Sequence, residues 1–259
     1  MFSSCFIRRP SPAAVNVRPI DQNRWPKDAI KYDKRNQKWI RAESVKDDWQ
    51  LRHIGKYFKL KLTPAGHLGV FTEQAFNWSW IDQLPISLTG RKAINLFAYT
   101  GGTTLALAKR GAEVVHLDAA KNVVAWAREN ATLSQFQNKK IRWIVDDANK
   151  FVEREIKRRN RYDFIVLDPP AVGHFGNRMT WNFHRDIEPL FQRLSCLASE
   201  QFCGLIATCH TEGCDQGQLR HLADKHFDIK HGSRESGSMD LTCKQGRKLN
   251  CGYYFRWHS

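Results

Sequence analysis

Between residues 93 and 167 the chain alternates apolar, strand-like segments with segments of helical periodicity, and this alternation restricts the possible folds most. Strands are predicted over residues 93–98, 114–117, 141–145 and 162–167, and helices over about 103–110, 123–133 and 148–158. Strands joined by helices in this way form a parallel sheet that is covered on both faces. Such sheets bind ligands at the carboxyl ends of their strands. The sequence therefore predicts an α/β fold with its functional site at that edge.

The segments on either side predict additions to this unit. A fifth strand is expected over residues 204–208, after a helix over about 182–197. Upstream, residues 56–62 are predicted to form a strand that pairs with residues 66–71, before a helix over about 73–83. We expect an N-terminal arm and small β extension over residues 1–87, which contacts the functional site, and a main domain over residues 88–259.

The charge of the chain favours an anionic partner. Its 41 Lys and Arg against 26 Asp and Glu give a formal net charge of +15 and a pI near 9.7. Nucleic acid is the leading candidate for such a basic protein. A solvated basic surface is the alternative, because no single run of Lys and Arg dominates.

The cysteines and the lengths of the apolar runs indicate the cellular compartment in which the protein works. The seven cysteines form no C-x-x-C pair, which argues against a disulfide framework and favours a reducing compartment, the cytoplasm. No apolar run approaches the ~20 residues of a membrane-spanning helix, so no membrane partner is expected. Arg8, Arg9 and Arg18 precede the first acid, Asp21, which leaves a mitochondrial transit peptide as the alternative to a loose arm. The sequence does not predict the oligomeric state.

Glycines and acids follow four of the predicted strands. Gly101 and Gly102 would let the backbone approach a ligand closely at the start of a helix. Asp118 lies ~20 residues after the first strand, where a carboxylate can accept bonds from ribose hydroxyls. Asp147 could accept a bond from an adenine amino group, and the rigid Asp168-Pro169-Pro170 turn could present backbone carbonyls at a reaction centre. Each acid alone could instead be a helix N-cap or turn residue. Together they indicate a nucleoside-containing ligand.

Three motifs carry a resemblance to a known family: Asn95-Leu-Phe-Ala-Tyr-Thr-Gly-Gly102, His116-Leu-Asp118 and Asp168-Pro-Pro170. They resemble those of class I S-adenosylmethionine-dependent methyltransferases, in particular a small branch of the 23S rRNA methyltransferases related to the cytosine-5 enzymes. The resemblance runs from about Trp25 to the C-terminus and is strongest over residues 71–173. Further similar segments are 66–67, 71–74, 124–130, 141–147, 151–155 and 254–257.

This resemblance implies a Rossmann-like methyltransferase fold with a seven-stranded, mostly parallel sheet and helices on both faces. The last strand would be antiparallel, here over residues 252–257, and would pair with a strand near residues 227–232. S-adenosyl-L-methionine is the implied cofactor, and RNA, with rRNA first, is the implied substrate. Thr72 stands where the family usually has Pro, and Val172 where it usually has Phe, so the local loop geometry stays open.

By the same resemblance, three groups of residues would contact the cofactor. Residues 71–74 would close over it, residues 95–101 would cradle its methionine moiety, and Asp118 and Asp147 would hold the ribose and the adenine. The full predicted set is Phe71, Glu73, Gln74, Asn95, Phe97, Ala98, Tyr99, Thr100, Gly101, Asp118, Ala119, Asp147, Ala148 and Asp168.

The acceptor atom decides which catalytic groups are needed. Methylation at C5 of cytosine requires a thiolate that adds at C6 and a base that removes the C5 proton. Cys209 is the candidate thiol, because it ends the strand over 204–208 roughly where the cytosine-5 enzymes keep their catalytic Cys; it could instead be a buried apolar residue. His210 could assist proton transfer, but neighbours in a strand point to opposite faces. The predicted catalytic set is Asp168, Pro169, Pro170 and Cys209.

Methylation of a ring or exocyclic nitrogen is the other possibility. An aromatic residue that stacks on the base would then normally follow Asp-Pro-Pro, where this chain has Ala171. His174 or Phe175 could supply the stacking, or could pack under the sheet. No metal is predicted, because Cys209, His210 and Cys214 match no common zinc spacing. Basic segments that could meet RNA, or could be solvated turns, are 178–181, 234–237 and 244–248.

Other classes of function compete with RNA methylation. An NAD-dependent oxidoreductase would need G-x-G-x-x-G, yet Phe97, Tyr99 and Thr104 occupy the positions of those glycines. A non-catalytic nucleic-acid-binding module would not need the predicted cofactor acids. A methyltransferase that acts on a protein or small molecule stays open as well.

Overall fold

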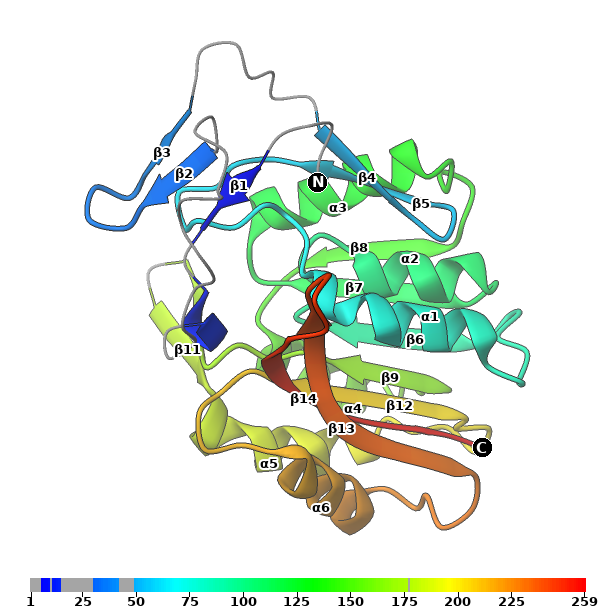
Figure 1. Ribbon diagram of the computed structural model, residues 1–259. Helices are drawn as coiled ribbons and strands as arrows, with labels where there is room; N and C mark the ends of the chain where they lie inside the picture. The colour runs from blue at the N-terminus through cyan, green and yellow to red at the C-terminus, as the bar shows by residue number, and fades with distance from the viewer. Residues whose placement is uncertain (1–5, 10, 15–29, 42–48, 177) are drawn as a thin grey trace.

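A central seven-stranded sheet organises the computed structural model, which describes residues 6–9, 11–14, 30–41, 49–176 and 178–259 (Figure 1). Of the possible transit peptide, residues 6–9 and 11–14 are described, and the rest lies outside the described residues. The strand order is β13 (Ser233–Thr242), β14 (Lys248–His258), β12 (Gly204–Cys209), β9 (Phe164–Leu167), β6 (Lys92–Leu96), β7 (Glu113–Asp118) and β8 (Ile141–Val145).

Strand direction follows the predicted pattern. The pairs from β12 through β9, β6 and β7 to β8 are parallel, and β14 runs antiparallel between β12 and β13. Strands β9 and β12 are buried along their whole length, as expected of central strands with helices on both faces. The predicted Rossmann-like methyltransferase fold, with its antiparallel last strand, is confirmed.

Three helices cover each face of the sheet (Figure 1). One face carries α1 (Ala75–Gln83), α2 (Gly102–Lys109) and α3 (Lys121–Leu133), and the other carries α4 (Ala148–Lys157), α5 (Phe183–Ser195) and α6 (Gln216–His226). Five of these helices, α1 to α5, agree with the predicted ones to within a few residues, and α6 was not predicted. None of the described helices has both the length and the apolar character needed to cross a membrane.

The N-terminal part adds small strands outside the central sheet. They are β1 (Ile7–Arg8), β2 (Ile30–Asp33), β3 (Lys38–Ile40), β4 (Trp49–His53) and β5 (Lys56–Leu60), with single turns of 3-10 helix at η1 (Pro12–Ala14) and η3 (Thr72–Gln74).

The prediction that β5 pairs with residues 66–71 is wrong. This strand pairs with β4 and not with residues 66–71. Ile54 and Gly55 join β4 to β5 with φ angles of 45° and 73°, the geometry of a tight hairpin turn. Residues 67 and 68 instead contact the chain just after β5, where their carbonyls accept hydrogen bonds from the backbone N–H groups of Thr63 and Lys61 and the His67 N–H donates to the Thr63 hydroxyl. Alternation identified the strand, but it could not identify its partner.

Two further predictions on the carboxyl half are corrected. The partner of β14 is β13, which begins at Ser233, immediately after the predicted range 227–232. Phe227 instead caps α6, and Gly232 turns the chain with a φ of 94°. Residues 172–182, which were not predicted as strands, form a hairpin of β10 (Val172–Phe175) and β11 (Arg178–Asn182).

Gly102 permits α2, the helix that follows β6, to pack closely against α1. A Cβ atom at Gly102 would lie 2.2 Å from Cζ2 of Trp78, a buried residue of α1. The Trp78 indole also donates a hydrogen bond of 3.1 Å to the hydroxyl of Thr103. Gly102 is therefore required by helix packing, a role that the sequence did not suggest.

Gly102→Ala is expected to lower the free energy of unfolding by about 1–3 kcal/mol, because the added methyl group overpacks the α1–α2 contact. Urea denaturation would measure the change. Gly217→Ala in α6 is the control, since its Cβ would approach only the end of the exposed Asp215 side chain, at 3.2 Å. Equal stability of Gly102→Ala and wild type would contradict this account.

Candidate functional site

A cavity of about 950 Å³ lies at the carboxyl ends of β6, β7, β9 and β12, within the size range of small-molecule sites. A recess of about 30 Å³ adjoins it and shares Phe71, Phe97, Tyr99 and Asp168 with it. Gly101 lines neither space. The predicted site residues that line the cavity or the recess are Phe71, Glu73, Gln74, Asn95, Phe97, Ala98, Tyr99, Thr100, Asp118, Ala119, Asp147, Ala148, Asp168, Pro169, Pro170 and Cys209.

The turn after β6 has a strained backbone. Phe97, Tyr99 and Gly101 have positive φ angles of 55°, 47° and 90°, and such angles cost non-glycine residues on the order of 1–3 kcal/mol each. Asp118 braces this turn, because its carboxylate accepts bonds from the backbone N–H of Tyr99 at 2.9 Å and of Ala120 at 3.0 Å. Burial raises the pKa of Asp118, against the lowering effect of these N–H groups. The acid thus holds the turn and lines the cavity.

Asn95 lies behind the turn, in the recess. It is 2% exposed, and its amide donates a 2.9 Å bond to the hydroxyl of Thr104 on α2. That hydroxyl also lies 2.9 Å from Nδ1 of His116, whose pKa falls to about 3 through burial. A neutral His116 therefore belongs to a buried chain of polar contacts that ties α2 to β6 and β7.

Asp147 serves as a helix cap as well as a cavity residue. Its carboxylate accepts a 3.0 Å bond from the backbone N–H of Lys150 and thereby caps α4. The neighbouring Asp146 forms an ion pair with Arg154. Asp147 is therefore both the N-cap of α4 and a residue of the cavity wall.

Glu73 is a buried acid that lacks a partner. Its side chain lines the cavity, the residue is 9% exposed, and no hydrogen-bond donor of the described residues reaches Oε2. A buried, unpaired carboxylate oxygen is costly unless a ligand satisfies it. A cationic or N–H group of a bound ligand would fit this position.

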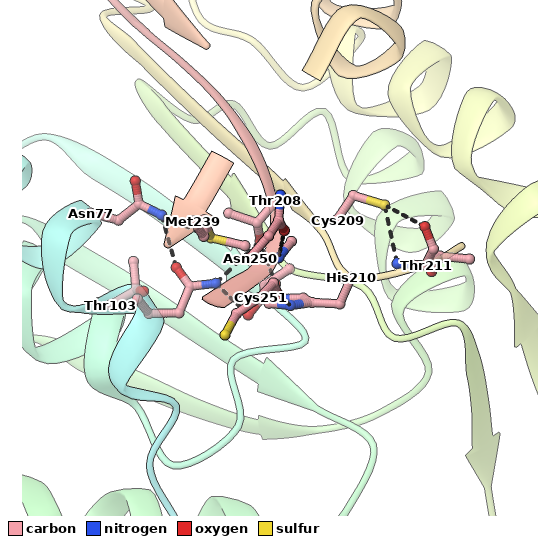
Figure 2. A network of polar contacts seen from close by, with 12 residues as sticks. Asn77, Thr103, Thr208, Cys209, His210, Thr211, Met239, Asn250 and Cys251 are labelled. Atoms are coloured by element: carbon pink, nitrogen blue, oxygen red, sulfur yellow. Dashed lines mark hydrogen bonds and ion pairs between the residues drawn. The ribbon is translucent and has the colours of Figure 1, made fainter. Parts of the chain in front are cut away.

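Asp168 connects three parts of the fold. Its Oδ2 accepts a 2.9 Å bond from the Gln74 amide, and its Oδ1 contacts the Thr208 hydroxyl and, at 3.1 Å, Nε2 of His210. The other ring nitrogen of His210 lies 2.6 Å from the carbonyl oxygen of Cys251 on β14 (Figure 2). Because both ring nitrogens face acceptors, the imidazole is held in its protonated form. Burial alone would lower the pKa of His210, but Asp168, the Cys251 carbonyl and Glu73 outweigh it and raise the pKa to about 9.

The β10–β11 hairpin forms a wall of the cavity directly after Asp-Pro-Pro. The Trp181 indole donates a 2.7 Å bond to the carbonyl of Pro170, and its ring lies 4.9 Å from that of Phe97. This bond occupies one of the carbonyls that the sequence suggested for the reaction centre. His174 lines the cavity and Phe175 does not, so His174 is the better placed of the two stacking candidates.

Cys209 forms part of the cavity wall, but its side chain is fully buried. Its sulfur lies 3.4 Å from the backbone N of Thr211, on the opposite side of the strand from the His210 ring (Figure 2). A hydrogen bond from Cys214 lowers the pKa of Cys209, and in return the pKa of Cys214 rises. As expected from strand geometry, the Cys209 and His210 side chains point to opposite sides of the strand, although both residues line the cavity.

The cavity is acidic although the protein is basic. Within the described part of the chain, Arg9 is the single Lys or Arg that lines it. The six acids of the lining are Glu73, Asp118, Asp146, Asp147, Asp168 and Glu212. This charge suits a ligand with positive groups and disfavours a phosphate chain inside the cavity.

Several cavity residues were missed by the sequence argument. Trp181 belongs to the segment 178–181 that the sequence offered as an RNA contact, but Arg9 had no signal for the cavity, because an N-terminal segment brings it in from elsewhere. The contact of His210 with Asp168 had a usable signal, since both follow strands that pair as neighbours in the sheet.

Known proteins resemble this chain in sequence and structure. The family described as S-adenosylmethionine-dependent methyltransferase matches residues 19–220. Ribosomal RNA large subunit methyltransferase K/L of Shewanella baltica is 26% identical over 164 residues, which cover 63% of this chain and 22% of that protein. The protein of the same name from Pseudoalteromonas atlantica is 31% identical over 147 residues, covering 55% and 20%. The chain spans between about a fifth and a third of the curated relatives it matches.

A solved structure agrees with the fold. The SAM-dependent methyltransferase from Agrobacterium tumefaciens superposes with a TM-score of 0.80 at 28% identity, covering 88% of this chain and 76% of that one. A second solved chain, complexed with SAH, reaches 0.72 at 17% identity and shares the fold.

The contacts of His210 predict a dependence of stability on pH. Its pKa is raised from 6.5 to about 9, so the stabilisation that it provides is complete below pH 6.5 and is lost as the pH rises through about 9. His210→Gln should therefore flatten the fall in the free energy of unfolding between these values, measured by urea denaturation. His221→Gln, on the exposed side of α6, should keep the wild-type slope. If the free energy of unfolding of His210→Gln falls with pH as steeply as that of wild type, the protonated His210–Asp168 pair is contradicted.

Proposed function

Because the chain belongs to the S-adenosylmethionine-dependent methyltransferase family, we propose that it transfers a methyl group to a base in RNA, with ribosomal RNA as the first candidate. One observation carries the proposal: the acidic cavity at the strand ends and the recess beside it collect nearly every residue predicted to contact cofactor or acceptor. The acceptor atom is C5 of a cytosine or a nitrogen of a base.

The residues of the cavity fit the cofactor chemically. S-adenosyl-L-methionine would supply a methyl group that its sulfonium already activates. The unpaired Oε2 of Glu73 can accept a bond from a positive or N–H group, and the six carboxylates favour a cation. We assign the ribose to Asp118, the adenine to Asp147, and the methionine moiety to the braced turn over residues 95–101. Phe71 and Gln74 would close this side.

The acceptor base would enter beside Asp168. Residues Gln74, Thr208 and His210 fix the Asp168 carboxylate from three directions, so the Asp-Pro-Pro turn is held in one position. A rigid turn keeps acceptor and methyl group aligned, which is the main task in methyl transfer. The Trp181 and His174 side chains would contact the flat face of the base.

The choice of RNA rests on two independent supports. The whole protein carries a net charge of +15 although its cavity is acidic, as expected if it binds phosphates over its surface. Two relatives are named as ribosomal RNA large subunit methyltransferases. We place the reaction in the cytoplasm, and we assign methyl transfer to residues 88–259 with residues 1–87 as an extension.

The proposed function predicts binding of S-adenosylmethionine or S-adenosylhomocysteine in calorimetry, and a missing methylated base in the rRNA of a deletion strain. Asp118→Asn should weaken cofactor binding about 10-fold or more, because it removes a charge-assisted hydrogen bond. Asp228→Asn, an exposed acid after α6, is the control.

Mass spectrometry of rRNA and tRNA nucleosides would identify the base. Failure to bind either cofactor form would refute the methyltransferase activity, and unchanged RNA would redirect the search to protein or small-molecule acceptors.

Cys209→Ala separates the two acceptor chemistries. If the acceptor is C5, loss of the thiol should abolish turnover and leave cofactor binding unchanged. The lowered pKa of Cys209 favours such a nucleophile, but its fully buried side chain means that the segment over 211–214 must move first. Single-turnover methylation of rRNA from the deletion strain is the assay, with Cys196→Ala as the matched exposed-cysteine control. Full activity of Cys209→Ala would assign the thiol to the core and the acceptor to a nitrogen.

A further inference from the structure

A second concave surface lies at the opposite edge of the central sheet from the acidic cavity. This groove of about 380 Å³ is formed at the amino ends of β6, β7 and β8. Lys92 and Glu113 begin β6 and β7, while Lys140 and Arg142 flank the start of β8. Arg161 enters from the loop before β9. The groove thus exists only because the strands are aligned in the sheet.

Its charge is the reverse of that of the cavity. Four cations line the groove against one acid, Glu113, which forms an ion pair with Lys140. No carboxylate of the described residues forms an ion pair with Lys92, Arg142 or Arg161. The Arg161 guanidinium instead donates a 3.0 Å bond to the carbonyl of Asn160. Nearby, Asp163 is satisfied by the Lys92 backbone N–H and the Ser199 hydroxyl.

Two basic segments meet at this edge although they are distant in sequence. One covers residues 139–142 and the other residues 157–161, and neither contains an acid. Arg158 pairs with the buried Glu155 at 3.2 Å. The exposed cations of the two segments are Lys139, Lys140, Arg142, Lys157, Arg158, Arg159 and Arg161. Each segment alone is an ordinary basic loop, and together they form a positive surface.

We propose that this groove binds the phosphate backbone of the RNA substrate at a distance from the methylated base. The inference rests on the RNA substrate of the proposed function. A cavity lined by six carboxylates cannot hold phosphates, so the backbone must be bound elsewhere on the surface. Unpaired Lys and Arg side chains on a groove rim are the groups that neutralise phosphates. The molecule would accept the base at one edge of the sheet and the backbone at the other.

The separation of the two sites sets a minimum length for the RNA. Strands β6 and β7 run from the groove to the cavity over five and six residues. At about 3.3 Å per residue, they separate the sites by about 16–20 Å. The distance of about 3.4 Å per nucleotide in a duplex strand is only the rise along the helix axis, and an extended single strand spans more per nucleotide, so an RNA longer than about two nucleotides is needed to reach both sites. A shorter RNA would fill the cavity without reaching the groove.

The test compares two full-length variants that each lose three positive charges. Lys140→Gln, Arg142→Gln and Arg161→Gln are combined in the groove variant, and Arg220→Gln, Lys225→Gln and Lys230→Gln in a control around α6. Affinity for a ribosomal RNA fragment from the deletion strain is measured between 50 and roughly 300 mM salt. The groove variant should lose about 10-fold or more in affinity, and its salt slope should fall by about 2–3. The control should bind like wild type, as should the groove variant with an RNA of about two nucleotides.

Equal losses in both variants, or no loss in the groove variant, would overturn the inference. Displacement of the RNA by polyglutamate at an equal concentration of negative charges would also overturn the inference, because the groove would then be a site for acidic protein. Calorimetry with S-adenosylmethionine keeps the two proposals apart. A protein that binds no cofactor but loses RNA affinity in the groove variant refutes the proposed activity and supports the groove.

Discussion

The site depends on the register in which β6 pairs with its two neighbours. Leu96, the last residue of β6, lies opposite Leu117 of β7 and Leu167 of β9. Phe97, Asp118 and Asp168 each come next in sequence, so the three strands deliver them to one edge together. A slip of one residue would turn each side chain to the other face of the sheet. The apolar strands fix this register, because burial on both faces leaves no room for an alternative.

The sheet also separates opposite charges. Acids line the cavity at the carboxyl ends, and cations line the groove at the amino ends. Such a distribution lets one molecule attract a cationic cofactor and an anionic polymer without competition between them. It also gives a physical reason why a net charge of +15 is compatible with an acidic site.

The alternation of helices and strands, the carboxyl-end acids and the Asp-Pro-Pro turn were all readable from the chain. They gave the fold class and the strand-end residues Asp118, Asp147 and Asp168 to Pro170, because strand order along the chain and position at a strand end are local properties. The other cavity and recess residues, such as Phe71 and Glu73, came from the family resemblance. Gly101 differs: its φ of 90° explains the glycine, and it lines neither space. The boundary near residue 88 stays a prediction, since Trp49, Phe58 and Trp78 share one buried cluster with residues of β6 and α2.

The sequence by itself determined the fold class and the edge at which the site lies, because periodicity and strand ends are encoded within short segments. Only the tertiary structure decided which partners meet: β4 with β5, His210 with Asp168, and Trp181 with Pro170. It also decided that two ordinary basic loops form one groove. These contacts join residues many positions apart, and their distances are set by packing and sheet register, which no local pattern contains.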